Sequence, residues 1–236
     1  MRRHTLLPLL CLLLTATSCN VYHQQAVDIP LLQEKGDLQA DISAGMTEAM
    51  LFGLSANANV SYAVSQHIGV QAYGDFSSPD LYYMQGAAGG FFPMSKNFVM
   101  EAYAGMGIGQ GKINGKRYID TQQQGYLHST YNEAFVQWDA GFVALANSHL
   151  DVGLGVRAGE IFGQTSEYCY YAPTDNEITY REQHLFAEPQ LMLRVGWEHF
   201  KFSFKFGGCL IDGEEEVTRH FPIHNLNFGL GISYRL

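Results

Sequence analysis

Apolar and polar residues alternate along most of this chain with a period of two. The clearest run covers residues 54–76, where a polar break at Ser65-Gln66-His67 separates two halves. This period is typical of β-strands with one apolar and one polar face, because successive side chains point to opposite faces. Each half has about ten residues, which is the length of a tilted strand that crosses a bilayer. We therefore interpret this segment as two strands of an antiparallel hairpin.

The same alternation recurs and predicts ten strands in all. Short breaks follow the second, fourth, sixth and eighth strands, whereas the connections after the third, fifth, seventh and ninth are longer and polar. The longer connections include residues 111–133, 164–182 and 212–225. An even strand number with short turns at one end and long loops at the other is typical of outer-membrane barrels. The predicted fold is therefore all-β: a ten-stranded antiparallel up-and-down transmembrane β-barrel with short periplasmic turns and long extracellular loops.

Two segments fit this pattern less well. Residues 82–94 form the weakest predicted strand, because the glycine-rich run 86–90 gives little contrast between its faces. Pro189 lies within the predicted strand 185–195 and removes one hydrogen bond from the sheet, so we expect a β-bulge there.

Composition supports a barrel over a helical membrane protein. The 236 residues include 25 Gly, 14 Tyr and 15 Phe. Hydrophobic residues make up 47% of the chain, but its mean hydropathy is only −0.09, so the apolar residues are dispersed among polar ones. No run reaches the roughly 18 apolar residues of a membrane helix. The net charge of −9 argues against a nucleic-acid partner, because phosphates would not be neutralised.

The N-terminus has the pattern of a secretory signal. Arg2-Arg3 precede the apolar stretch 6–14, and small residues at 15–18 lead to Cys19. The cysteine after Ala-Thr-Ser resembles a bacterial lipobox, which implies cleavage before Cys19 and lipidation of its thiol; an ordinary signal peptide is the alternative. The predicted organisation is a signal peptide (1–18), a lipidated extended tether (19–36) and a barrel (37–236).

Over residues 37–236 the chain resembles the small bacterial outer-membrane β-barrel proteins of the opacity/adhesin type, here preceded by a lipoprotein signal peptide. The resemblance lies in the architecture and in a final strand with Tyr234 and Leu236. It implies a bacterial outer-membrane location, with both termini on the periplasmic side and outer-membrane lipids as partners.

The polar face would line the lumen, and it is nearly balanced in charge. Six acids oppose five bases there: Asp41, Asp75, Glu101, Asp139, Asp151 and Glu188 against Arg157, Arg194, Lys201, Lys205 and Arg235. Unpaired charge inside a narrow barrel is costly, so we expect these groups to pair and close the lumen. A narrow channel for small solutes is the alternative.

An enzymatic function is not predicted. Asp75, Asp80, His128, Asp212, His220 and His224 are the candidates for activating a water, but they have no recognisable spacing. No Gly-x-Ser-x-Gly elbow is present. His220 and His224 stand four apart beside Pro222, which does not define a metal site. We expect no catalytic residues, no metal and no cofactor.

Two cysteines remain in the predicted barrel, Cys169 in a long loop and Cys209 near the loop end of the ninth strand. The cell envelope permits disulfides, so they either form a bond or remain free thiols.

The long loops are rich in tyrosine, which offers contact area with a polar handle. The candidates for surface contacts are Tyr118, Tyr126, Tyr131, Tyr168, Tyr170, Tyr171 and Tyr180. The alternative is that they form an aromatic girdle. The predicted function is a non-enzymatic structural or surface-interaction protein whose surface ligand or host partner the sequence does not name. A lipid-anchored soluble periplasmic β-barrel domain is a further alternative.

Overall fold

The computed structural model describes residue 22 and residues 29–47, 54–78, 80–114, 125–169, 177–212 and 226–236. Nearly all of these residues lie in strands. The strands are β1 (Leu38–Thr47), β2 (Leu54–Ala63), β3 (Ile68–Ser78), β4 (Leu81–Pro93), β5 (Phe98–Asn114), β6 (Gly125–Ala144), β7 (Leu150–Cys169), β8 (Ile178–Gly196), β9 (Phe200–Gly208), β10 (Leu210–Ile211) and β11 (Leu226–Arg235).

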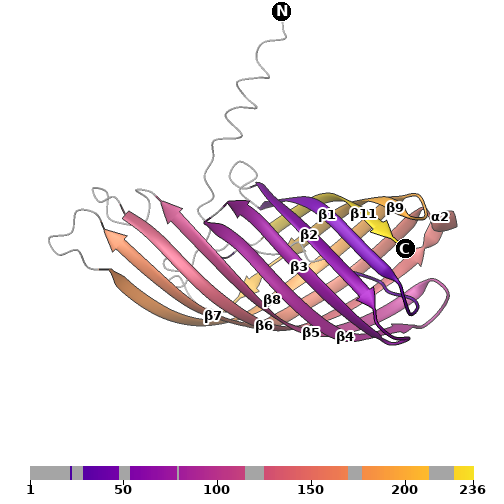
Figure 1. Cartoon of the computed structure of the whole chain (residues 1–236), viewed down its shortest axis with the longest axis horizontal. Helices are drawn as coiled ribbons and strands as arrows, with labels where there is room; N and C mark the ends of the chain where they lie inside the picture. The colour runs from indigo at the N-terminus through magenta and orange to yellow at the C-terminus, as the bar shows by residue number, and fades with distance from the viewer. Residues whose placement is uncertain are drawn as a thin grey trace, which may run out of the picture.

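The strands form one closed antiparallel barrel (Figure 1). Each strand from β1 to β8 pairs with the next, β8 pairs with β9, and β11 closes the sheet between β9 and β1. The two-residue β10 continues the line of β9 along β8, so β9 and β10 count as one strand and the barrel is ten-stranded. The predicted ten-stranded barrel is therefore confirmed, including the weak strand at 82–94. Closure leaves no unpaired sheet edge, which is a condition for a strand to cross a bilayer.

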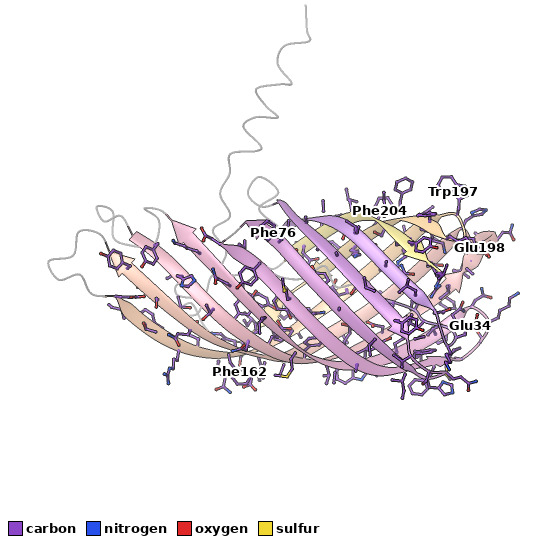
Figure 2. The ribbon with its side chains drawn as sticks, in the orientation of Figure 1. Glu34, Phe76, Phe162, Trp197, Glu198 and Phe204 are labelled. Atoms are coloured by element: carbon purple, nitrogen blue, oxygen red, sulfur yellow. The ribbon has the colours of Figure 1, made fainter. Side chains whose placement is uncertain are left out.

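The outer surface carries an apolar belt around the barrel. Ile42 is 71% exposed and Phe204 is 46% exposed, and both alternate with buried polar neighbours. Figure 2 shows the side chains of Phe204 and Phe162 on the outside of the ribbon. Exposed apolar side chains occur on every long strand of the barrel. Such a surface favours contact with lipid, because in water it would be a large exposed apolar patch. The described part of the chain contains no helix that is long and apolar enough to span a membrane.

Four neighbouring strands are much longer than the rest (Figure 1). Strands β5 to β8 have 17, 20, 20 and 19 residues, whereas β1 to β3 have 10 or 11. The predicted loop boundaries at 111–133 and 164–182 are therefore wrong, since most of those residues extend the four strands. Their outward side chains turn polar beyond the belt, so the apolar alternation that reveals a membrane strand is lost there.

The turns fall at one end of the barrel as predicted. Residues 64–67, 94–97 and 197–199 are short connections, and the β6–β7 turn is the four-residue helix α2 (Leu145–Ser148). Figure 1 places α2 at the same end as the C-terminus. We call this the short-turn end and the opposite one the loop end. One expectation fails at the loop end, because only residues 79 and 80 separate β3 from β4.

Pro189 interrupts the hydrogen-bond ladder of β8, but the predicted β-bulge does not occur there. On one side it pairs in regular register with Val156 of β7. On the other side, Gln190 pairs with Gly207 and Ala187 with Leu210, so the register on either side of the gap is the same. On this side the ladder is interrupted at Glu188 and Pro189 only, which agrees with the missing N–H of the proline.

Candidate functional site

The lumen is filled by polar and charged side chains. All eleven charged residues predicted for the inner face occur on strands of the barrel, and ten of them are buried, while Arg235 at the short-turn end is half-buried. Because the period of two fixes which side chains point inward, the sequence identified this set correctly. The partners of these groups are set by the fold.

Arg157 of β7 is the centre of one buried cluster. Its guanidinium lies 2.5 Å from Glu188 Oε2 and 3.4 Å from Glu133 Oε1, and it also donates to Gln85. The three charged side chains have no exposed area. Phe135 lies under the guanidinium with its ring centre 5.0 Å from Cζ. Sequence reasoning missed Glu133, because this residue stood at the edge of a predicted loop.

Two further ion pairs start from β9 and reach over one neighbouring strand on either side of it. Lys205 Nζ lies 2.5 Å from Asp41 Oδ1 of β1, and Lys201 Nζ lies 2.6 Å from Asp151 Oδ1 of β7. Asp75 and Asp139 also take part in hydrogen bonds with neutral side chains, Asp139 with Gln137 at 2.7 Å. The predicted pairing of opposite charges is therefore seen in the groups around Arg157, Lys201 and Lys205.

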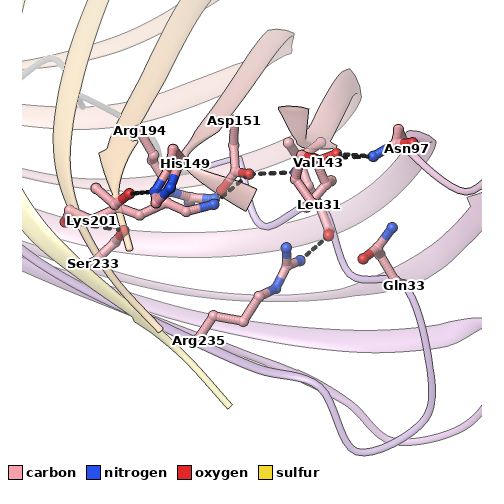
Figure 3. A network of polar contacts seen from close by, with 12 residues as sticks. Leu31, Gln33, Asn97, Val143, His149, Asp151, Arg194, Lys201, Ser233 and Arg235 are labelled. Atoms are coloured by element: carbon pink, nitrogen blue, oxygen red, sulfur yellow. Dashed lines mark hydrogen bonds and ion pairs between the residues drawn. The ribbon is translucent and has the colours of Figure 1, made fainter. Parts of the chain in front are cut away.

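Three of the predicted charges bind the main chain of the N-terminal segment. Glu101 accepts hydrogen bonds from the backbone N–H groups of Leu31 and Leu32 at 2.9 and 2.8 Å. Arg194 donates to the carbonyl of Ile29 at 2.8 Å, and Arg235 donates to the carbonyl of Leu31. Figure 3 shows the Arg235 guanidinium directed at Leu31. These side chains satisfy both donors and acceptors of an extended backbone inside the barrel.

Apolar side chains anchor the same segment. Ile29, Leu31 and Leu32 have no exposed area. Ile29 and Leu31 pack with Val99, Val143 and Met192, whereas Leu32 packs with Ala63 and Phe91. These neighbours come from β2, β4, β5, β6 and β8, so residues 29–32 lie inside the barrel, surrounded by its wall.

Tyr22 lies deeper in the lumen. Its hydroxyl donates to Glu188 Oε1 at 3.0 Å and lies 3.3 Å from Glu133 Oε2, which joins it to the Arg157 cluster. Its ring lies against Tyr131, with the centres 5.3 Å apart. Along β8, the bonding partners of Tyr22 and Ile29 are Glu188 and Arg194, six residues and about 20 Å apart.

The predicted extended tether at 19–36 therefore lies inside the barrel at Tyr22 and residues 29–32, whereas residues 33–36 are half-buried or exposed at the short-turn end. Cys19 and the predicted signal peptide lie outside the described residues. The sequence does carry a signal for this placement, since the apolar run Ile29-Pro30-Leu31-Leu32 is unusual for a solvated tether. It names no partner for that run, however.

The four tyrosine candidates that the structure describes separate into three groups. Tyr131 is wrongly assigned to the surface, because it faces inward and is 2% exposed in the aromatic cluster of the lumen. Tyr180 is half-buried, and its hydroxyl donates to Glu167 Oε2 at 3.4 Å. Tyr126 and Tyr168 stack on the outer face. Tyr118, Tyr170 and Tyr171 lie outside the described residues.

The disulfide between Cys169 and Cys209 does not form in this structure. Cys209 is a free thiol with 2% exposure, inside the lumen. Its neighbour Leu210 pairs with Ala187, which pairs with Ala158 of β7, eleven residues before Cys169. That is about 36 Å along the strand, far beyond the span of a disulfide.

The catalytic candidates do not come together among the described residues. Asp75 and His128 face opposite sides of the wall, since Asp75 is buried in the lumen while His128 follows the outward register of β6. His220 and His224 lie outside the described residues. Asp212 instead lies 3.9 Å from His184 Nδ1, and Glu182 lies 3.2 Å from His184 Nε2, at the loop end. No group of three or more metal-binding side chains occurs in the described ranges.

The outer face of β5 to β8 beyond the belt has a different chemistry. Tyr126 and Tyr168 stack with ring centres 5.2 Å apart, and Lys112 Nζ lies 5.0 Å from the centre of the Tyr126 ring. Beside them is a shallow hollow of about 400 Å³, whose lining residues are Thr130, Asn132, Phe162, Gly163, Gln164, Arg181, Glu182 and Gln183. We call this surface the projecting sheet.

Three solved structures are similar to this chain to different degrees. The outer membrane protease OmpT from Escherichia coli matches with a TM-score of 0.59 at 9% identity, over 85% of this chain and 94% of that one. Ail, the attachment invasion locus protein of Yersinia pestis, matches with a TM-score of 0.33 at 11% identity, over 86% and 99%. A de novo designed transmembrane β-barrel gives 0.35 at 14%, over 86% and 98%. No protein-family model and no curated protein matches the sequence. At these identities the likeness to OmpT shows that the chain has the fold of outer-membrane β-barrels.

Proposed function

We propose that this chain is a non-enzymatic protein of the bacterial outer membrane that acts through the projecting sheet as a structural or surface-interaction protein. The observation that carries the proposal is the extension of β5 to β8 past the apolar belt, where their outward side chains become polar. Four paired strands form a stiff platform, and stacked tyrosines with a nearby lysine provide contact area with hydrogen-bonding ends.

The orientation of this platform can be tested on intact cells with an amine reagent that does not cross the outer membrane. Lys112 lies on the projecting sheet, whereas Lys96 lies in a turn at the short-turn end. We expect Lys112 to be labelled and Lys96 to remain protected until the cells are lysed. Labelling of Lys96 alone on intact cells would mean that the projecting sheet faces the periplasm, and the proposed surface function would fail.

A lipid on Cys19 is part of this proposal. The sequence supports it, because small residues at 15–18 follow an apolar stretch and lead directly to Cys19. Labelling with an alkyne fatty acid tests the anchor, and label that persists in Cys19→Ala would contradict it.

The alternative of a channel for small solutes predicts steady conductance in a planar bilayer. The buried ion pairs and the segment 29–32 both occupy the lumen, so we expect no steady current from the folded chain. Ohmic conductance that changes after Lys205→Gln and Asp41→Asn would favour the channel.

Proteolysis is a second candidate function, because His184 lies between Glu182 and Asp212 at the loop end and because OmpT is a protease. A His beside two carboxylates is an arrangement that activates water. Under our proposal, purified protein in outer-membrane lipids does not cleave casein. Cleavage that His184→Ala abolishes, while Arg181→Ala retains it, would replace the non-enzymatic proposal.

A further inference from the structure

The lumen has the properties of a binding site for an extended peptide. A peptide segment inside a barrel carries N–H and C=O groups that water cannot reach, and each unsatisfied group is costly. Glu101 accepts from two consecutive N–H groups, while Arg194 and Arg235 donate to carbonyls on the same stretch. The three charged residues lie on β5, β8 and β11, so the backbone of the segment is bound from three different strands of the barrel.

Selectivity comes from the side chains. Ile29, Leu31 and Leu32 fill apolar sites where glycines leave room. An ideal Cβ at Gly153 would lie 3.1 Å from Ile29 Cγ2, and one at Gly141 would lie 2.9 Å from Leu31 Cδ1. A larger residue in either place would therefore compete with the segment for space. The wall of the lumen is shaped around these apolar side chains.

A third contact fixes the direction of the segment. Gly36 donates to the carbonyl of Ala63 at the short-turn end, and the tyrosine hydroxyl at position 22 is held by Glu133 and Glu188 deeper inside. Residues 29–36 therefore run toward the short-turn end, and Tyr22, earlier in the chain, lies nearer the loop end. Leu31, Tyr22 and their partners lie up to 204 positions apart in sequence, so only closure of the barrel brings them together.

We propose that the lumen is a receptor for an extended apolar peptide, and that Tyr22 and residues 29–32 of the same chain are bound there as its ligand. Recognition combines backbone hydrogen bonds from Glu101, Arg194 and Arg235 with apolar sites for Ile29, Leu31 and Leu32. The inference does not depend on what the projecting sheet binds.

The first test is a disulfide between the segment and the wall. At positions 29 and 153 the two Cβ atoms would lie within about 4.6 Å, close to disulfide geometry. In the full chain with Cys19, Cys169 and Cys209 replaced by serine, we expect Ile29→Cys and Gly153→Cys to form a bond on mild oxidation. The control pair Gln33→Cys and Gly153→Cys should not, because Gln33 lies at the short-turn rim, where its side chain bonds Lys96. A folded barrel in which the first pair stays reduced would overturn the proposal.

The second test separates peptide recognition from simple occupancy. Ile29→Asp with Leu31→Asp in the full chain places two carboxylates at apolar sites and should release the segment. We expect this variant to bind a fluorescent synthetic peptide of residues 20–33 at least ten times more tightly than the same peptide carrying both Asp substitutions. The wild-type chain should bind neither peptide. Equal binding of the two peptides, or no binding by a variant whose heat-shifted gel mobility shows a folded barrel, would reject the proposed receptor.

Discussion

Replacing Arg157 by methionine is expected to lower the free energy of unfolding by about 3–5 kcal/mol. The substitution leaves Glu133 and Glu188 without the guanidinium that lies between them, and neither side chain has any exposed area. A buried carboxylate without a compensating charge has lost its hydration and gained nothing in return. Urea unfolding in phospholipid vesicles, followed by tryptophan fluorescence, measures the change.

Two control variants separate charge from packing. Arg181→Met removes an arginine on the outer face of β8 beside the hollow and should change stability by about 0.5 kcal/mol or less. Adding Glu133→Gln and Glu188→Gln to Arg157→Met removes the buried negative charge and should recover more than half of the loss. If the triple variant is no more stable than Arg157→Met, the lost interaction is not the ion-pair cluster.

Phe204→Arg is expected to destabilise the barrel in a bilayer by about 2–4 kcal/mol. Phe204 lies midway along β9 (Phe200–Gly208), on the outer face and within the apolar belt. An arginine there would place its charge near the centre of the hydrocarbon, where no water or counter-charge is available. Reversible unfolding from phospholipid vesicles measures this difference against the wild-type chain.

The matched control for this substitution lies on the same outward face beyond the belt. Gln164→Arg on β7 adds the same side chain beside the hollow of the projecting sheet, where we expect a cost of about 0–1 kcal/mol. Similar costs at positions 164 and 204 would mean that no hydrocarbon surrounds β9. The soluble periplasmic β-barrel would then be the better description.

The sequence by itself determined which face of each strand points outward. Alternation with a period of two separates Phe204 from Lys205 and Ile42 from Asp41, and this holds whatever the strands pair with. The recurrence of this alternation predicts the number of strands, and the short breaks after the even strands predict the end at which the short connections lie. These features are local, so they need no knowledge of distant contacts.

The same pattern did not predict where the long loops begin and end. Residues 111–114 and 125–133 belong to β5 and β6, but above the apolar belt both faces of the strands are polar or mixed. Without contrast between faces the period of two disappears, although the backbone pairing continues. For that reason the pattern predicts a loop at Tyr131 and Glu133, whereas both side chains are buried in the lumen.

Only the tertiary structure decided what fills the barrel. Lys205 meets Asp41 across 164 positions in sequence, and Arg194 meets the carbonyl of Ile29 across 165. Composition and spacing show that charges face inward but not which partner each finds, because that depends on the curvature and closure of the sheet. The same closure creates the space into which residues 29–32 fit, so their role became visible only when ten strands met around them.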